Sequence, residues 1–110
     1  MAKVTKSGFL IEQGDSMVRI LIRGELSMVV VPEMREILAR TLSTMQFDTL
    51  EVDLSETIFM DSTGISFLIA QKKIAIRDGK AMRLRNPSPP VMNILTLVQL
   101  ISFFEVVDQP

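Results

Sequence analysis

The chain has 110 residues, 47% of them hydrophobic and 23% charged, with a formal net charge of −1 and no cysteine or histidine. This composition excludes disulfides, thiolate metal sites and any Ser-His-Asp triad, and it provides neither the basic field nor the aromatic stacking surface that nucleic-acid binding needs. Because the length suits one core and the apolar runs are too short to cross a bilayer, we expect a single cytoplasmic domain over residues 1–110, without membrane insertion, metal or other cofactor.

The first predicted elements are two strands joined by a tight turn. Residues 9–11 and 17–23 are rich in aliphatic side chains, and residues 13–16 between them have the composition of a turn. A helix is expected next, because Pro32 suits a first helical position and inward-facing residues then recur at helical spacing. These inward positions are Met34, Ile37, Leu38, Thr41, Leu42 and Met45.

The middle of the chain continues with a strand and a second helix. Residues 49–54 alternate strictly between polar and apolar side chains, which predicts a strand with one buried face. The apolar positions of this strand are Leu50, Val52 and Leu54. A helix is then expected from about residue 63 to residue 78, closed by Gly79 in a left-handed conformation.

The last predicted elements are a strand at 82–85, a helix that begins at Ser88 ahead of two prolines, and a strand at 103–107. The complete order is β-β-α-β-α-β-α-β. Such an order predicts an α/β fold with a mixed, mainly parallel sheet and an antiparallel hairpin at one edge.

The segment FMDSTGI at residues 59–65 places small polar residues at the start of the second helix. The first amides of a helix lack intrahelical partners, and either Asp61 or Ser62 can accept a hydrogen bond from them as an ordinary cap. The same amides and the helix dipole would also tolerate a phosphate on Ser62. Gly64 either lets another surface approach the backbone or relieves crowding. Spacing alone favours the cap.

The second helix carries apolar residues on two sides. The stripe expected to face the core consists of Ile65, Leu68, Ile69, Ala75 and Ile76. Phe67 and Ile74 lie on the opposite side of the predicted helix. This second patch is either covered by the protein itself or available to a partner, and helical geometry favours neither alternative.

Several segments, taken together, resemble the STAS domain family, which includes the anti-sigma factor antagonists. They are Gly24-Glu25-Leu26, the strand at 49–55, MDSTGI at 60–65 and the tail at 93–108. The resemblance implies one STAS domain over nearly the whole chain, with Ser62 as a phosphorylation site. Asp61, Thr63 and Gly64 would shape the acceptor loop, and Thr63 is the alternative acceptor.

The resemblance also implies the partners. The unphosphorylated protein would bind a serine-kinase anti-sigma factor and so release a sigma factor. Phosphorylation of Ser62 by that kinase would end the complex, and a PP2C-type phosphatase would restore it. The residues expected to contact the partner are Glu25, Leu26, Ser27, Ile65, Phe67 and Ile74.

One position departs from the family pattern. Many phosphorylated members continue Gly-Glu-Leu with an aspartate, whereas this chain has Ser27, followed by the apolar run Met28-Val29-Val30-Val31. A carboxylate that would assist a charge-based switch is therefore missing, and an effector other than a sigma factor fits this sequence as well.

Two further functions stay open beside the regulated adaptor. One is a constitutive scaffold subunit that is not phosphorylated, such as the STAS-like component of a lipid-transport complex. The other is an enzyme with Ser62 as its nucleophile. We expect no enzyme, because the chain has no histidine base and no Gly-x-Ser-x-Gly elbow.

Overall fold

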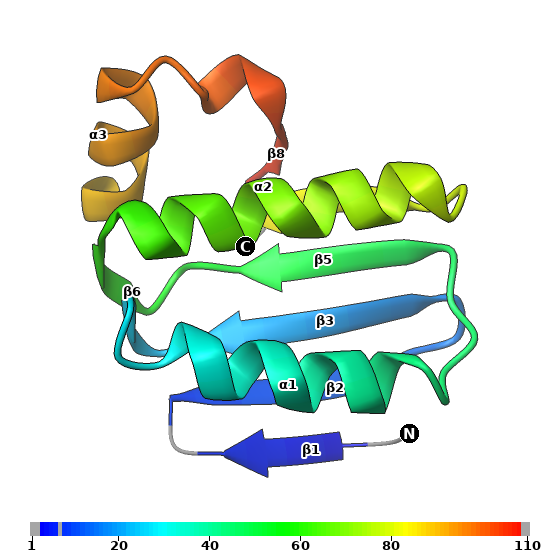
Figure 1. Ribbon diagram of the computed structural model, residues 1–110. Helices are drawn as coiled ribbons and strands as arrows, with labels where there is room; N and C mark the ends of the chain where they lie inside the picture. The colour runs from blue at the N-terminus through cyan, green and yellow to red at the C-terminus, as the bar shows by residue number, and fades with distance from the viewer. Residues whose placement is uncertain (1–2, 7, 109–110) are drawn as a thin grey trace.

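The computed structural model describes residues 3–6 and 8–108, in which strands and helices alternate (Figure 1). The strands are β1 (Lys3–Lys6), β2 (Phe9–Gln13), β3 (Met17–Ile22), β4 (Gly24–Leu26), β5 (Thr49–Asp53), β6 (Thr57–Met60), β7 (Ala81–Arg85) and β8 (Glu105–Val107). The helices are α1 (Val31–Leu42), α2 (Ser62–Arg77) and α3 (Pro89–Leu97), followed by a 3-10 turn, η1 (Ile101–Phe103).

The described residues form one six-stranded sheet with the order β1-β2-β3-β5-β7-β8. The first three strands pair antiparallel, and the pairs from β3 to β8 are parallel. Helices α1 and α2 cover one face of this sheet, and α3 stands at one end of it (Figure 1). The predicted α/β fold with a mixed, mainly parallel sheet is therefore confirmed.

Three short strands extend the predicted order. β1 adds an antiparallel edge beside β2, while β4 and β6 pair in parallel as a separate two-stranded sheet. Gly24, with a φ of 83°, begins β4 in a conformation that favours glycine and turns the chain away from β3. The last strand begins at Glu105 rather than at Phe103, because residues 101–103 form the η1 turn.

The helix-covered face of the sheet provides the core. The alternating pattern of β5 is confirmed on this side, since Leu50, Val52 and Leu54 are all buried. Gly79 adopts the predicted left-handed conformation after α2, with a φ of 70°. Ser88 stands just before α3 as expected, but its hydroxyl donates to the carbonyl of Thr57 instead of capping the helix.

The buried side of α2 differs from the predicted one. Its buried residues recur at spacings of three and four, and they are Gly64, Phe67, Leu68, Gln71 and Ala75. Ile76, predicted to face the core, is 64% exposed, whereas Phe67, predicted on the outer side, is fully buried. Leu68 and Ala75 are buried as predicted. The prediction was wrong for Phe67 and Ile76, because Gly64 and Gln71, which a hydrophobic pattern does not count, belong to the buried stripe.

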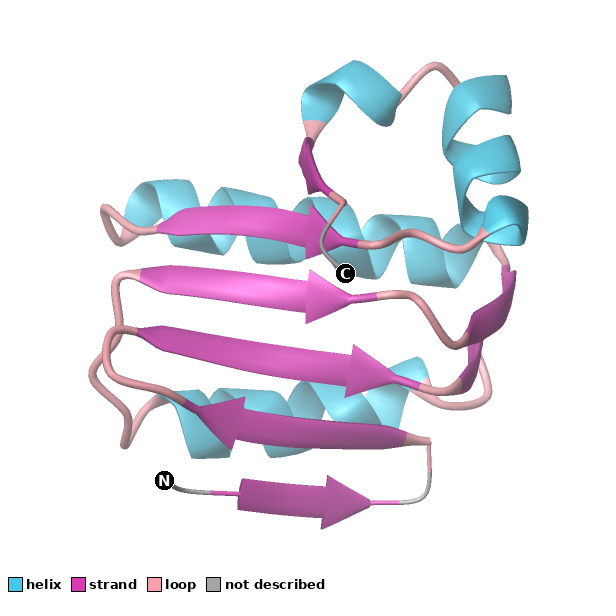
Figure 2. Cartoon of the chain, turned by 180° about the vertical axis from the view of Figure 1, so that it is seen from behind, coloured by secondary structure: helices cyan, strands magenta, loops and turns pink. Residues whose placement is uncertain are grey.

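Figure 2 shows the opposite face of the sheet toward the viewer, with α1 and α2 behind it. Charged residues form a row across this face. One residue from each of the five strands β2, β3, β5, β7 and β8 lies in this row, and the charges alternate from strand to strand. In strand order the residues are Glu12, Arg19, Glu51, Arg83 and Glu105. The polar positions of β5 thus face away from α1 and α2, as the alternation predicted.

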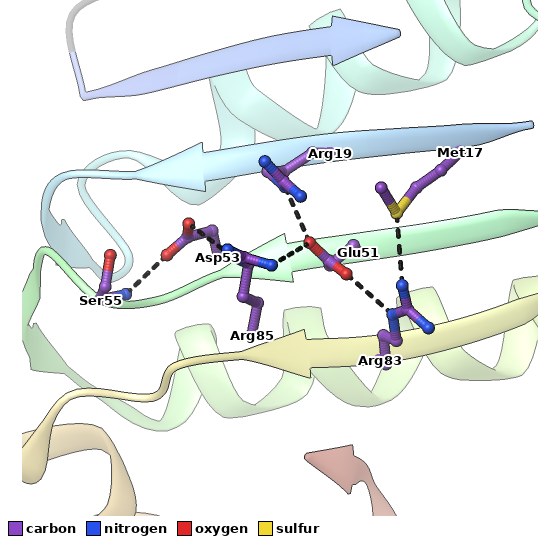
Figure 3. A network of polar contacts seen from close by, with 7 residues as sticks. All are labelled: Met17, Arg19, Glu51, Asp53, Ser55, Arg83 and Arg85. Carbon is purple, nitrogen blue, oxygen red and sulfur yellow. Dashed lines mark hydrogen bonds and ion pairs between the residues drawn. The ribbon is translucent and has the colours of Figure 1, made fainter. Parts of the chain in front are cut away.

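Glu51 is the centre of this charge row and is itself buried (Figure 3). Its carboxylate accepts from Arg19 Nε at 2.7 Å and from Arg83 Nε at 2.8 Å, and Arg85 Nη1 lies 3.6 Å away. Burial raises the pKa of Glu51, but the hydrogen bonds and the positive charges of Arg83 and Arg19 together more than offset this and leave the pKa below its ordinary value of 4.5. The arginine side chains, not a helix, exclude water from this carboxylate.

Candidate partner-binding site at the start of α2

Asp61 joins the start of α2 to the loop that follows β4. As the residue before the helix, it accepts a hydrogen bond from the Gly64 N–H through Oδ1 at 2.9 Å. Its Oδ2 accepts from the Met28 N–H at 3.0 Å. These backbone bonds, led by the one from Met28, hold the pKa of Asp61 below its ordinary value of 3.8. Of the two cap candidates in the sequence, Asp61 is therefore the one that caps.

Ser62 is the first residue of α2, and its side chain is exposed. The hydroxyl makes no hydrogen bond with any residue that the structure describes, so local capping does not occupy it. It stands at the positive end of a helix dipole, beside the first unpaired amides of the helix. Thr63, the alternative acceptor, is half-buried.

Gly64 explains how closely α2 approaches β4. A Cβ added at this position would lie 2.1 Å from the carbonyl oxygen of Leu26 and 2.8 Å from Cγ of Met60. Both distances are shorter than real Cβ contacts allow, so only glycine fits here without a backbone shift. The close approach anticipated for Gly64 is thus made within the chain, and it fixes Ser62 beside the end of β4.

Ser27, at the position where the resemblance leads one to expect an aspartate, is buried and has a structural role. Its hydroxyl donates to the carboxylate of Glu25 and accepts from the Val29 N–H at 3.2 Å. Its carbonyl accepts from the N–H groups of Val30 and Val31, which begin α1. Ser27 therefore organises the loop between β4 and α1 and does not present a side chain to the surface.

Apolar side chains surround this end of the molecule. Four are strongly exposed, two in the loop after β4 and two on β6, and we call them the apolar rim: Met28, Val29, Ile58 and Phe59. β4 and β6 are hydrogen-bonded neighbours, and the Met28 amide contacts Asp61 directly. Met28 and Val29 lie in the loop that is bonded to Asp61, while Ile58 and Phe59, consecutive on β6, point to opposite sides of that strand. Large exposed apolar residues are typical of surfaces that contact another molecule.

Not all of the predicted contact residues lie at the surface. Leu26, Ser27 and Phe67 are buried, so their side chains cannot meet a partner in this conformation. Ile65 is partly buried against the core, and Glu25 is exposed. Ile74 is exposed too, but it lies twelve residues after Ser62, roughly 18 Å along the helix axis.

Comparison with known proteins identifies the family. Residues 9–104 match the family model described as "Mlab, STAS domain". The chain belongs to the STAS domain family. The resemblance seen in the sequence is thereby confirmed, and the matched range includes the Asp61 clamp, Ser62 and the apolar rim of this STAS domain.

Solved structures share the fold of this STAS domain. The anti-sigma factor antagonist SpoIIAA in its unphosphorylated form is 22% identical, with a TM-score of 0.79 over 93% of this chain and 88% of that chain. The phosphorylated form of SpoIIAA from Bacillus is 21% identical, with a TM-score of 0.73 over 93% and 91% of the two chains. A variant of RsbS from Moorella thermoacetica is 21% identical, with a TM-score of 0.75 over 91% and 86%. At sequence identities this low, the structural similarity establishes a common fold and nothing more.

Two features of the STAS domain site were missed by sequence reasoning. The bond between Met28 and Asp61 joins residues 33 positions apart, and no local pattern signals it. Ile58 and Phe59 are apolar residues in the sequence, yet both are exposed on β6. Among the described residues there is no cluster of three or more His, Cys, Asp or Glu that could hold a metal ion. None of the helices in that part of the chain has the length and apolar character needed to cross a membrane.

Proposed function

We propose that this STAS domain is a cytoplasmic partner-switching adaptor controlled by phosphorylation of Ser62, and that it is not an enzyme. Unphosphorylated, the surface formed by Ser62 and the apolar rim binds a serine-kinase anti-sigma factor and thereby releases the sigma factor. The kinase then phosphorylates Ser62 and ends the complex, and a PP2C-type phosphatase restores the binding form. The observation that carries the proposal is the exposed, unoccupied hydroxyl of Ser62, since Asp61 alone supplies the cap.

A phosphate on Ser62 would be compatible with the fold but not with a docked partner. The first amides of α2 and the helix dipole favour an anion at this position. On the outer side the phosphate would add about −1.5 to −2 charges next to Asp61, beside the exposed side chains of the apolar rim. If a partner had to desolvate that charge at a cost of about 3–4 kcal/mol, affinity would fall by about two to three orders of magnitude.

The two SpoIIAA structures support a switch that leaves the fold intact. Structures of SpoIIAA in the unphosphorylated and the phosphorylated form both match this chain, with TM-scores of 0.79 and 0.73. In that relative, then, both states keep a fold similar to this one. A switch that acts through surface charge, without refolding, is consistent with the exposed position of Ser62.

The experiment that tests the switch combines modification and binding. Phosphopeptide mass spectrometry on the protein from its own host, across growth and stress conditions, should find phosphate on Ser62 at an occupancy that changes. A Ser62→Asp variant should fold normally but bind the host's serine-kinase anti-sigma factor about 100-fold more weakly. Ser16→Asp is the matched control, because Ser16 is an exposed serine in the turn between β2 and β3, and it should bind normally. Undiminished binding of Ser62→Asp would contradict a charge switch.

A second candidate function is a permanent scaffold subunit of another complex, such as a lipid-transport system. The exposure of the apolar rim favours it, because four large apolar side chains suit an interface that never dissociates. The absence of an aspartate at Ser27 points in the same direction. A Ser62→Ala variant that retains every partner and all cellular function, together with an unmodified Ser62 under all conditions, would select the scaffold.

A further inference from the structure

A second feature of the molecule, away from Ser62, is a cavity between the C-terminal halves of α1 and α2. Its volume is about 340 Å³, within the range of small-molecule sites. Apolar side chains from both helices, from β5 and from the loop before β5 form most of its wall: Leu38, Leu42, Met45, Leu50, Ile74 and Ala75. On α2 the cavity begins at Gln71, roughly 13 Å along the axis from Ser62.

One polar side chain inside this cavity has no partner. Gln71 is only 7% exposed, yet its amide makes no hydrogen bond with any described residue. Every fully enclosed side-chain nitrogen or oxygen in the described residues does have a partner. The Gln71 amide therefore keeps its accessible surface toward the cavity that it lines. A nearly buried amide without a partner is uncommon in proteins, and it offers hydrogen bonds to a bound molecule.

A free positive charge lies at the same end of the cavity. α1 and α2 run side by side in the same direction (Figure 1). Arg35 is the first residue of α1 to line the cavity, as Gln71 is the first of α2, and Arg35 has no ion pair with any described residue. At the other end of the cavity Arg77 pairs with Asp78, and Lys80 donates to the Phe47 carbonyl and lies over the Phe47 ring.

We propose that this cavity binds a small amphipathic carboxylate, of which a medium-chain fatty acid is the simplest example. The Arg35 guanidinium pairs with the carboxylate, and the side-chain N–H of Gln71 donates to it. The alkyl chain lies along the apolar wall toward Leu42, Met45 and Ala75. At the Gln71 end the ligand meets one cation, Arg35, which matches a single negative charge, whereas a phosphomonoester would bring about two.

Titration of the full chain with decanoate, kept below its micelle concentration, tests this proposal. Nuclear magnetic resonance on ¹⁵N-labelled protein should show saturable shifts of the Gln71 side-chain amide, which is identified by its loss in Gln71→Leu. Decanol should bind about tenfold more weakly because it lacks the charge, and acetate should not bind because it lacks the chain. Absence of saturable decanoate binding would overturn the proposal, as would equal binding of decanol.

Three variants place the ligand in the cavity. Arg35→Gln should weaken decanoate binding about tenfold, while Arg40→Gln, an exposed arginine of α1 outside the cavity, should leave it unchanged. Ala39→Phe should abolish binding, since Ala39 is an exposed residue at the cavity and a larger side chain there fills it. Circular dichroism would establish that each variant is folded. Folded Ala39→Phe or Arg35→Gln protein that binds decanoate like the parent chain would exclude this site.

Discussion

At the scale of the single residue, Gly64 is the described glycine at which an added Cβ would make the shortest contacts. An added Cβ would meet the Leu26 carbonyl at 2.1 Å, and backbone cannot move aside as a flexible side chain can. We expect Gly64→Ala to lower the free energy of unfolding by about 3 kcal/mol, measured by urea denaturation.

Gly14 provides the matched control for this substitution. A Cβ there would lie 3.5 Å from the Met17 carbonyl, an ordinary contact, in the exposed turn between β2 and β3. Gly14→Ala should change the free energy of unfolding by less than about 0.5 kcal/mol. If both alanine variants were equally stable, the close approach of α2 to β4 would not be the reason for glycine at 64.

At the scale of the element, the orientation of α2 decides which of its apolar residues form the core. Phe67 is fully buried, while Ile76 is largely exposed. Phe67→Ala should therefore cost about 3–5 kcal/mol of unfolding free energy, and Ile76→Ala less than about 0.5 kcal/mol. Thermal and urea denaturation would rank the two variants. A larger loss for Ile76→Ala would mean that α2 is rotated toward the stripe expected from hydrophobicity.

The same helix shows how far sequence reasoning reaches. The ends of α2 were predictable, because Asp61 and Gly79 are local signals that act on the nearest amides and carbonyls. Its rotation was not, since Gly64 is buried by close approach to β4 and Gln71 lines a cavity. Both causes are tertiary, so a count of apolar residues along one helix cannot detect them.

In the candidate site, too, local features were predictable from the sequence and tertiary contacts were not. The position of Ser62 at a helix start was evident from the motif. The buried state of Ser27 and the contact of Met28 with Asp61 depend on how two distant loops meet. β4 and β6 were missed because strands of three and four residues are too short to show alternation.

At the scale of the whole molecule, the sheet is stabilised differently on its two faces. Helices bury apolar residues on one face, while the other carries the alternating charge row centred on Glu51. Arg19 and Arg83 lie on either side of Glu51, and each is about one-third exposed. Removing the central charge would leave these two guanidinium groups without the carboxylate that joins β3, β5 and β7.

Glu51→Gln keeps the shape of the side chain but removes its charge, and we expect it to lower the free energy of unfolding by about 2 kcal/mol near neutral pH. Because the pKa of Glu51 is depressed in the folded protein, its carboxylate stabilises the fold fully above the ordinary value of 4.5. That stabilisation is lost as pH falls through the folded-state pKa. Urea denaturation from neutral pH to about pH 3 should therefore show the gap between parent and variant closing below 4.5. Glu36→Gln, an exposed acid on α1, should show no such gap, and a constant Glu51 gap at every pH would assign the loss to packing instead of charge.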